Sequence, residues 1–215
     1  MDKIIPVWKD RGISSYDVIR KIKKNILNVK IGHCGTLDPF AEGILLICIG
    51  SATKQVENLM SYEKIYEAKI FIGKETDTLD ITGNVIKEHR IPPINKNKIE
   101  NALKHFDGKI FQSPPYYSAV KFHGVRLYKF ARNDIHIRKK PREVVVNNIK
   151  ILNFDDDSVS LRISVGKGFY IRSFAKDLAA KLDSFGHLQE LKRVSIGPYN
   201  KSSIVKIKDI VKCQN

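Results

Sequence analysis

The apolar positions of the chain follow two spacings, one typical of helices and one typical of strands. Val18 and Ile22 lie at helical spacing, on one face of a predicted helix. Ser14 or Ser15 can cap this helix, which is expected to run to about Lys24. A spacing of four also predicts a helix over residues 170–182. Two further helices are expected, over 52–60 after the Gly50-Ser51 break and over 96–106 after the Pro92-Pro93 linker.

Strict alternation of apolar and polar residues marks the strands. It predicts a strand over residues 66–73. The turn residues 80–84 then predict a hairpin, closed by a short strand over 85–87. The runs 144–154 and 158–165 have the pattern of two paired strands. Helices and strands alternate without a repeat, which indicates an α+β fold.

The length and composition are those of a globular protein. The chain has 215 residues, of which 42% are hydrophobic, enough for a core that needs neither disulfides nor a structural metal. No long polar linker interrupts it, so we expect a single domain over residues 1–215.

The charge points to a polyanionic partner and is concentrated in three segments. The formal net charge is +15. Basic residues exceed acidic ones by five over 1–30, by seven over 113–142 and by five over 191–215, whereas acidic residues exceed basic ones by three over 38–90. Solvated charged faces would account for the two terminal segments as well. The acidic segment 38–90 is better explained by an enzyme, which would bind phosphates around a catalytic carboxylate. A protein that only coats nucleic acid would have little reason to keep such a segment.

Several classes of protein are excluded. The longest apolar run, 44–49, is too short to span a membrane, and no secretory signal is visible at the amino terminus. The three cysteines form no CxxC pair, which favours a reducing, cytoplasmic location. Phosphate-binding, dinucleotide-binding, zinc and serine-hydrolase motifs are missing, so no cofactor and no metal is expected.

The segment 32–43, GHCGTLDPFAEG, has the composition of a tight loop that presents one acid. Pro39 keeps Asp38 in an extended conformation, so the carboxylate can project into a cleft. An Asp-Pro pair is also a common turn starter. His33 favours the functional interpretation, because its ring can stack on a base or hydrogen-bond it.

A second candidate is the segment 166–172, GKGFYIR, between a predicted strand and a predicted helix. Arg172 falls in the first helical turn, where a cation opposes the helix dipole, so an acid or a phosphate is expected beside it. An arginine partner would keep a nucleophilic carboxylate ionised and oriented. The alternative is a loop that contacts phosphates only.

The third candidate is the segment 113–142, which we interpret as a mobile arm inserted in the domain. Its aromatic residues are interleaved with basic ones, a pattern that suits stacking on bases and neutralising phosphates. A disordered loop would have a similar composition. The side chains expected to contact RNA are those of Lys121, Arg126, Lys129, Arg132, Arg138, Lys139 and Lys140.

These motifs together resemble the TruB family of bacterial-type tRNA pseudouridine-55 synthases. The resemblance runs in order along nearly the whole chain. Its segments are GHCGTLDPFAEGILLICIGSATK (32–54), YEAKIFIGKETDTLDITG (66–83), QSPPYYSAVKFHGVRLYKFAR (112–132) and KGFYIRSFAKDLAAKL with HLQELKR (167–193).

The resemblance implies a chemistry centred on Asp38. This residue would be the nucleophile that releases uracil from its C1′ linkage, attacking either the sugar or C6 of the ring. Tyr66 would lie against the target uracil and is the candidate to remove the C5 proton, and Arg172 would form an ion pair with Asp38. The expected product is pseudouridine at position 55 of the tRNA TΨC loop, formed without a cofactor.

The resemblance also implies a pocket and an RNA grip. Tyr170 and Leu191 would wall the pocket, and His33 would fill the space left by the flipped base. Residues 113–142 would be the thumb that closes on the TΨC arm. The implied fold has a mixed, mostly antiparallel central sheet flanked by helices, with the thumb as an insertion.

Four features depart from the family pattern. Lys9 lies between Trp8 and Asp10, where the family has an acid followed by Lys-Pro, and Cys34 replaces a small or hydroxyl residue. Around the pocket leucine, 190–193 reads ELKR. Family members usually continue into a carboxy-terminal PUA-like RNA-binding domain, which is not expected here. The basic segment 191–215 would partly compensate for the loss of that domain's contact surface. The lysines concerned are Lys201, Lys206, Lys208 and Lys212.

Two alternatives stay open at this point. The chain could be a tRNA-binding or folding-assistance protein in which catalysis is secondary or lost, or a pseudouridine synthase for another RNA site. A cytoplasmic monomer is expected in each case. Asp38, Tyr66 and Arg172 together favour the enzyme, because binding alone would need only the basic segments.

Overall fold

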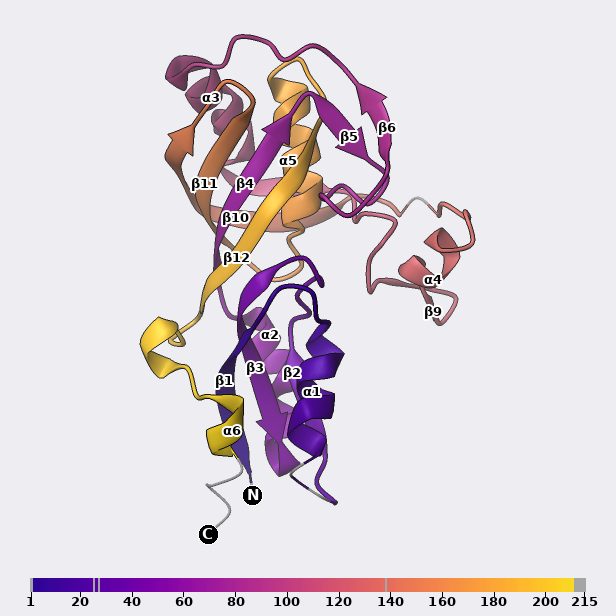
Figure 1. Ribbon diagram of the computed structural model, residues 1–215, viewed down its shortest axis with the longest axis vertical. Coiled ribbons are helices and arrows are strands. Elements are labelled where there is room, and N and C mark those ends of the chain that lie inside the picture. The colour runs from indigo at the N-terminus through magenta and orange to yellow at the C-terminus, as the bar shows by residue number, and fades with distance from the viewer. Residues whose placement is uncertain (1, 25, 27, 138, 211–215) are drawn as a thin grey trace. The chain divides into compact units, whose positions relative to one another are not determined.

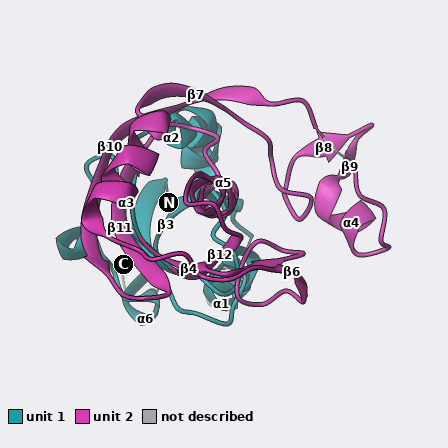
Figure 2. Cartoon of the chain, turned by 90° about the horizontal axis from the view of Figure 1, so that it is seen from above, with its two compact units in different colours: residues 1–67, 191–215 teal, residues 68–190 magenta. Residues whose placement is uncertain are grey.

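The computed structural model describes residues 2–24, 26, 28–137 and 139–210 (Figure 1). The chain forms two compact units, shown in different colours in Figure 2. Unit 1 comprises Met1–Glu67 and Leu191–Asn215, and unit 2 comprises Ala68–Glu190. Two long strands, β4 (Lys64–Ile72) and β12 (Gly186–Ile196), run through both units.

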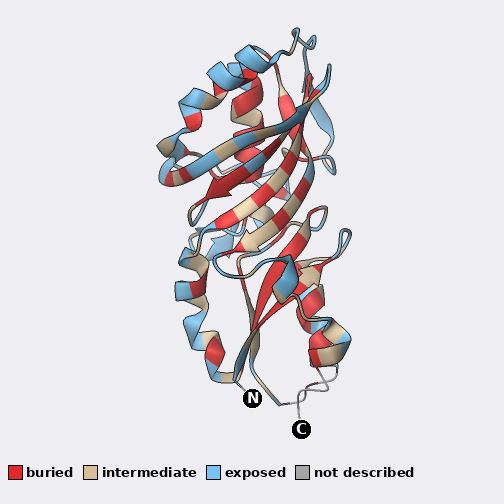
Figure 3. Cartoon of the chain, turned by 90° about the vertical axis from the view of Figure 1, so that its left-hand side faces the viewer, coloured by how far each residue is buried: buried red, intermediate tan, exposed pale blue. Residues whose placement is uncertain are grey.

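Unit 1 is built around strand β3 (Glu42–Ile49), whose apolar run is fully buried (Figure 3). Strands β1 and β2 pair with β3 in antiparallel fashion, and β12 pairs with it in parallel. Apolar residues of α1 pack on one side of these strands. The other elements are β1 (Lys3–Lys9), α1 (Ser15–Lys23), β2 (Ile31–Cys34), η1 (Gly50–Gln55), α2 (Val56–Ser61), η3 (Lys201–Ser203) and α6 (Ile207–Ile210).

Unit 2 contains a sheet in the order β12-β4-β11-β10-β7, in which β10 pairs antiparallel with both β11 and β7. Two small hairpins, β5–β6 and β8–β9, lie outside it. The rings of Phe106 and Phe174 meet edge to face at 4.9 Å and join η2 to α5. The elements are β5 (Lys74–Thr76), β6 (Val85–Glu88), α3 (Lys96–Leu103), η2 (Lys104–Phe106), β7 (Gly108–Gln112), β8 (Lys121–Phe122), β9 (Val125–Arg126), α4 (Leu127–Ala131), β10 (Arg142–Phe154), β11 (Ser158–Val165) and α5 (Ile171–Lys181).

The predicted α+β class is confirmed, with its mainly antiparallel sheet. Helix α1 begins behind Ser14, whose side chain accepts from the backbone of Asp17 while Asp17 accepts in return. This reciprocal cap satisfies two backbone donors at the start of the helix. Strand β4 buries every second residue, as its alternation predicts.

Other predictions were wrong in part. The predicted helix 52–60 begins as the 3-10 helix η1, and 104–106 is also a 3-10 turn. The strand at 85–87 pairs with β5 rather than with residues 66–73, because Gly73 adopts a φ of +119° and redirects the chain. Both ends of the segment 32–43 are strands, so the loop proper covers only 35–41.

No described helix is both long and apolar enough to cross a membrane.

Candidate active site

The loop 35–41 of unit 1 presents Asp38 between two buried strands. Cys34 ends β2 and Glu42 begins β3, so both ends of the loop are anchored in one sheet. Asp38 is half-buried, and its carbonyl accepts a hydrogen bond from the Ala41 N–H at 3.1 Å. The neighbouring Leu37 is buried. The loop is therefore a tight turn with its single acid at partial exposure.

Lys9 ties this loop to the amino-terminal strand. Its ammonium is fully buried and donates to the carbonyls of Ala41 at 2.6 Å, Ile13 at 2.8 Å and Asp10 at 3.0 Å. A fourth carbonyl, that of Pro39, lies at 3.4 Å. Burial lowers the pKa of Lys9 to about 8, although the nearby Asp38 carboxylate acts in the opposite direction.

A second tie holds the backbone just before the acid. The Ser15 hydroxyl accepts from the Leu37 N–H at 2.9 Å and donates to the Leu37 carbonyl at 3.1 Å. The Gly12 N–H donates to the Pro39 carbonyl at 2.8 Å. Hydrogen bonds to the residues on either side of Asp38 thus fix its backbone from the segment 9–15.

Arg193 provides a third tie and joins the loop to Tyr66. Its guanidinium is buried and donates to the carbonyls of Ile44 at 2.8 Å and Gly35 at 2.9 Å. A third contact reaches the Tyr66 hydroxyl at 3.5 Å. Arg193 can make these contacts because its backbone lies close to that of Gly43. A Cβ atom at Gly43 would clash with the backbone of Arg193.

Unit 1 thus brings the Asp38 loop, Tyr66 and Arg193 together. Tyr66 lies in β4 and Leu191 in β12, and both are buried. His33 lies in β2 and is half-buried. The roles predicted for these side chains stay predictions.

In unit 2, Arg172 lies in the first turn of α5 and is buried. Its guanidinium donates to the carbonyls of Tyr117 at 2.7 Å and Thr78 at 2.9 Å, and lies 3.6 Å from the Asp80 carboxylate. The expected acid beside Arg172 is therefore present in the same unit. Asp38 belongs to unit 1, so its ion pair with Arg172 stays a prediction.

Asp80 is itself held by a ring of donors. Its Oδ1 accepts from the hydroxyls of Thr78 at 2.8 Å and Thr82 at 2.5 Å, and from the Thr82 N–H at 3.0 Å. Asp80 is buried and has Arg172 on its other oxygen. The turn 77–83 therefore orients the acid that holds the arginine.

Tyr170 precedes α5 and is half-buried. The Gln112 side chain donates to its carbonyl at 3.0 Å and accepts from its N–H at 2.7 Å. The Arg142 guanidinium lies 5.5 Å from the centre of its ring.

The thumb, residues 113–142, contains β8, β9 and α4, which extend to one side of unit 2 (Figure 2). Aromatic rings of the thumb contact other rings and cations within it. The ring centres of Tyr116 and His136 lie 4.9 Å apart, and Nζ of Lys139 lies 4.6 Å from the centre of the Phe122 ring. Arg138 lies outside the described residues. The exposed candidates for RNA contact are Lys121, Arg126, Lys129, Arg132 and Lys140, whereas Lys139 is half-buried.

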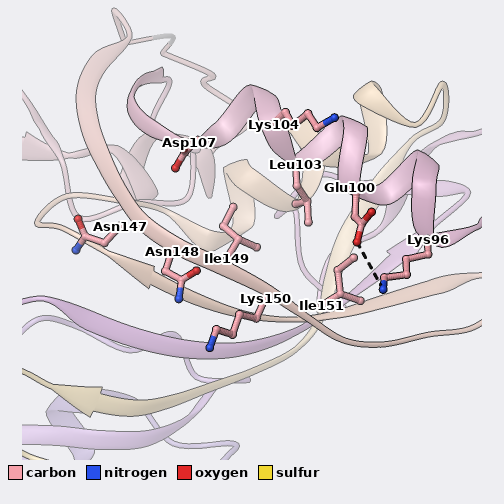
Figure 4. Close-up of a pocket in the computed structure, with 10 residues that line it drawn as sticks. All are labelled: Lys96, Glu100, Leu103, Lys104, Asp107, Asn147, Asn148, Ile149, Lys150 and Ile151. Carbon is pink, nitrogen blue, oxygen red and sulfur yellow. Dashed lines mark ion pairs between the residues drawn. The ribbon is translucent and has the colours of Figure 1, made fainter.

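A separate groove of about 570 Å³ lies between α3 and β10 of unit 2 (Figure 4). Lys96, Lys104 and Lys150 line it, and Lys96 forms an ion pair with Glu100 at 3.7 Å. None of the predicted site residues lies in this groove. Within the described residues, no three His, Cys, Asp or Glu side chains lie close enough together to hold a metal ion.

Sequence reasoning missed four contributors to the site. Lys9 and Arg193 were noted only as positions in the family pattern and its departures, and Asp80 only as part of a turn and of a matching segment. Gln112 was noted only as the start of a motif. The spacing Thr78-x-Asp80-x-Thr82 was the one local pattern that could have indicated a constrained carboxylate.

Known proteins of one family match this chain over most of its length. A model described as TruB family pseudouridylate synthase (N terminal domain) matches residues 21–171. A tRNA pseudouridine synthase B of Clostridium acetobutylicum is 41% identical over 98% of this chain and 72% of its own length. The protein of the same name from Fusobacterium nucleatum is 42% identical, over 93% and 69%. That of Endomicrobium trichonymphae is 40% identical, over 97% and 91%.

Solved structures agree with the fold. A chain in a crystal structure of a Cbf5-Nop10-Gar1 complex is 28% identical with a TM-score of 0.74, over 97% of this chain and 53% of that one. A chain of an H/ACA RNP bound to a substrate RNA containing 2′-deoxyuridine is 25% identical with a TM-score of 0.71, over 97% and 52%. This chain spans about half the length of those two chains. The family model and the curated relatives together show that the chain belongs to the TruB family of pseudouridylate synthases.

Proposed function

We propose that this protein converts a uridine in the TΨC loop of tRNA, at position 55, to pseudouridine. Relatives with the name tRNA pseudouridine synthase B support this substrate. The observation that carries the proposal is the joint anchoring of the Asp38 loop and Tyr66 by Arg193. A nucleophile and a proton acceptor acting on one base need such a fixed relation.

In the proposed reaction the Asp38 carboxylate forms a bond to C1′ of the ribose or to C6 of the uracil. The glycosidic bond between N1 and C1′ breaks, the uracil turns, and C5 forms the new bond to C1′. The bond to Asp38 breaks in turn: C5 displaces the carboxylate from C1′, or the carboxylate leaves C6 as the proton on C5 is lost. Tyr66 is the candidate acceptor of that proton, and N1 of the uracil takes up a proton in its place. Reactants and product are isomers, so the step balances without an oxidant, a reductant or a second substrate.

The backbone ties serve this reaction by limiting the motion of Asp38. Lys9, Ser15 and Arg193 hold the loop at four of its carbonyls and one N–H. Small displacements of a nucleophile are costly, since a misplacement of about 1 Å can reduce a rate by about 100-fold. The ties also leave the carboxylate partly exposed, as a group that meets an incoming base must be.

RNA binding is assigned to the thumb and to the basic segment after β12. The thumb exposes five of its predicted cations. Lys201, Lys206 and Lys208 are exposed as well, whereas Lys212 lies outside the described residues. The extruded uracil would lie between Tyr170 and Leu191, with His33 in the space that it leaves. We place this activity in the cytoplasm. We also propose that the active protein is a monomer, and light scattering would test that oligomeric state.

An unmodified tRNA transcript tests the function directly. The protein should form one pseudouridine, at position 55, when the product is mapped by carbodiimide labelling and primer extension. Asp38→Asn should form none and still bind the tRNA. Asp10→Asn, an exposed acid in the same unit, is the matched control and should remain active. Binding without any product would favour the tRNA-binding alternative, and product at other sites would favour a broader enzyme.

A further inference from the structure

The base of the thumb is hydrogen-bonded to the segment that begins helix α5. The Gln112 side chain, 2% exposed, pairs with both backbone groups of Tyr170. The Ser173 hydroxyl donates to the Ser113 carbonyl at 2.8 Å. Arg172 donates to the Tyr117 carbonyl at 2.7 Å. All four contacts lie within unit 2 and join residues 112–117 to residues 170–173.

The far end of the thumb reaches the same segment. Arg142, the last thumb residue, places its guanidinium 5.5 Å from the ring centre of Tyr170, within the range of a cation–π contact. Tyr170 is therefore contacted by Gln112, where the chain leaves the sheet to form the thumb, and by Arg142, where the chain returns to the sheet.

Gln112 matches the backbone of Tyr170 chemically. A primary amide offers one donor and one acceptor side by side, so it can satisfy an N–H and a C=O together. Tyr170 is the N-cap of α5, and its own side chain makes no capping hydrogen bond. A charged or apolar side chain at position 112 would leave at least one of these two backbone groups without a hydrogen bond. An unsatisfied buried backbone group lowers the stability of the folded protein.

We propose that Gln112 is a positioning residue that couples the thumb to the uridine pocket. It sets the backbone of Tyr170 and thereby the start of α5, which carries Arg172. RNA that binds the thumb shifts residues 112–117. The pair of hydrogen bonds between the Gln112 amide and the Tyr170 backbone, called the clamp below, transmits this shift to Tyr170 in the pocket wall. This inference rests on the proposed function.

Gln112→Met tests the clamp, because methionine has a similar length and leaves no buried charge. We expect tRNA affinity to stay within about a factor of three, while the single-turnover rate falls by about 10- to 100-fold. Gln55→Met is the matched control, since Gln55 is exposed and makes no capping bond. An unchanged rate in Gln112→Met would overturn the proposal.

Gln112→Glu separates positioning from a loss of stability. An ionised glutamate keeps the acceptor for the Tyr170 N–H and loses the donor to its carbonyl, whereas a protonated one restores both. The activity of this variant relative to the parent should therefore rise as the pH falls, and that of Gln112→Met should not. Equal pH profiles for the two variants would contradict the clamp.

Amide hydrogen exchange tests the coupling without relying on catalysis. Binding of tRNA to the parent should slow exchange in peptides from the thumb and from residues 168–174. In Gln112→Met the slowing should persist in the thumb and be lost in 168–174; equal protection there would overturn the coupling. A parent that forms no pseudouridine in any tRNA would refute the proposed function, and the exchange result would then decide on the clamp alone.

Discussion

The guanidinium of Arg193 lies 3.5 Å from the hydroxyl of Tyr66, and both side chains are buried in the unit that carries Asp38. The same guanidinium holds the Gly35 carbonyl at the start of the Asp38 loop. One side chain thus relates the proposed proton acceptor to the loop of the proposed nucleophile.

Arg193→Lys should impair both catalysis and stability. Lysine keeps the charge but cannot reach three acceptors with one planar fork. Loss of one or two buried hydrogen bonds should lower the free energy of unfolding by about 1–3 kcal/mol in urea titrations. The single-turnover rate should fall by about 10-fold or more. Arg20→Lys, at an exposed arginine, is the control, and an equal effect of the two changes would contradict the assignment.

Gly43→Ala should destabilise the protein strongly. Gly43 has a φ of +127°, and an added Cβ would clash with the backbone of Arg193. Strain and overpacking together should cost about 3 kcal/mol or more, measured by urea denaturation. Gly12 also has a positive φ, of +83°, but open space around it. Gly12→Ala should cost only about 1 kcal/mol, and a similar loss in both variants would refute the close approach.

The outlines of the fold could be predicted because their causes are local. Ser14 and the spacing of Val18 and Ile22 define α1 within a few residues of sequence. The partner of β6 was missed because a single glycine, Gly73, changes the chain direction before the short strand β5. Strand β3 was not predicted, since a buried apolar run has no alternation.

The site was less predictable because its ties are long-range. Lys9 meets Ala41 across 32 positions, and Arg193 meets Gly35 across 158. No spacing pattern in the sequence encodes such contacts. Asp38 could be found from its loop composition, whereas the groups that hold it required the folded structure.

Lys9 should give stability a specific pH dependence. Burial holds its pKa at about 8 in the folded protein, below the ordinary value of 10.5. Between these values the unfolded chain binds more protons at this position than the folded protein does. The contribution of Lys9 to the free energy of unfolding therefore increases as the pH rises from 8 to 10.5, by at most about 1.4 kcal/mol per pH unit. Urea titrations should show the parent gaining on Lys9→Met over this range, and a constant difference would contradict the lowered pKa.

The two buried cysteines should resist modification in the folded protein. Their sulfur atoms lie 3.2 Å apart, and Cys34 and Cys48 are both buried. The hydrogen bond that the Cys34 thiol shares with Cys48, together with burial, raises the pKa of Cys34, so little of its thiolate is present to react. In a Cys213→Ser background, Ellman's reagent should react with neither thiol until urea unfolds the chain. Rapid reaction of the native protein would contradict their burial.

Neutralising the thumb should weaken tRNA binding in a salt-dependent way. Replacing Lys121, Arg126 and Lys129 by glutamine removes three exposed cations. If each contacts a phosphate, the slope of log K against log salt should decrease in magnitude by roughly 2–3. The same replacement of three exposed lysines in α3 and η2 is the control and should leave the slope unchanged. The lysines of this control are Lys96, Lys98 and Lys104.

The basic segment 191–215 can be tested in the same assay. Glutamine at Lys201, Lys206, Lys208 and Lys212 should lower affinity and the salt slope if this segment contacts tRNA. Unchanged values would show that it does not.

Release of tritium from tRNA labelled at C5 of uridine measures the step assigned to Asp38, because the C5 proton leaves only when the new C5–C1′ bond has formed. The parent and Asp10→Asn should each release one equivalent per tRNA, and Asp38→Asn should release none at matched tRNA occupancy. Equal release by Asp38→Asn and the parent would contradict the assignment of Asp38 as the nucleophile.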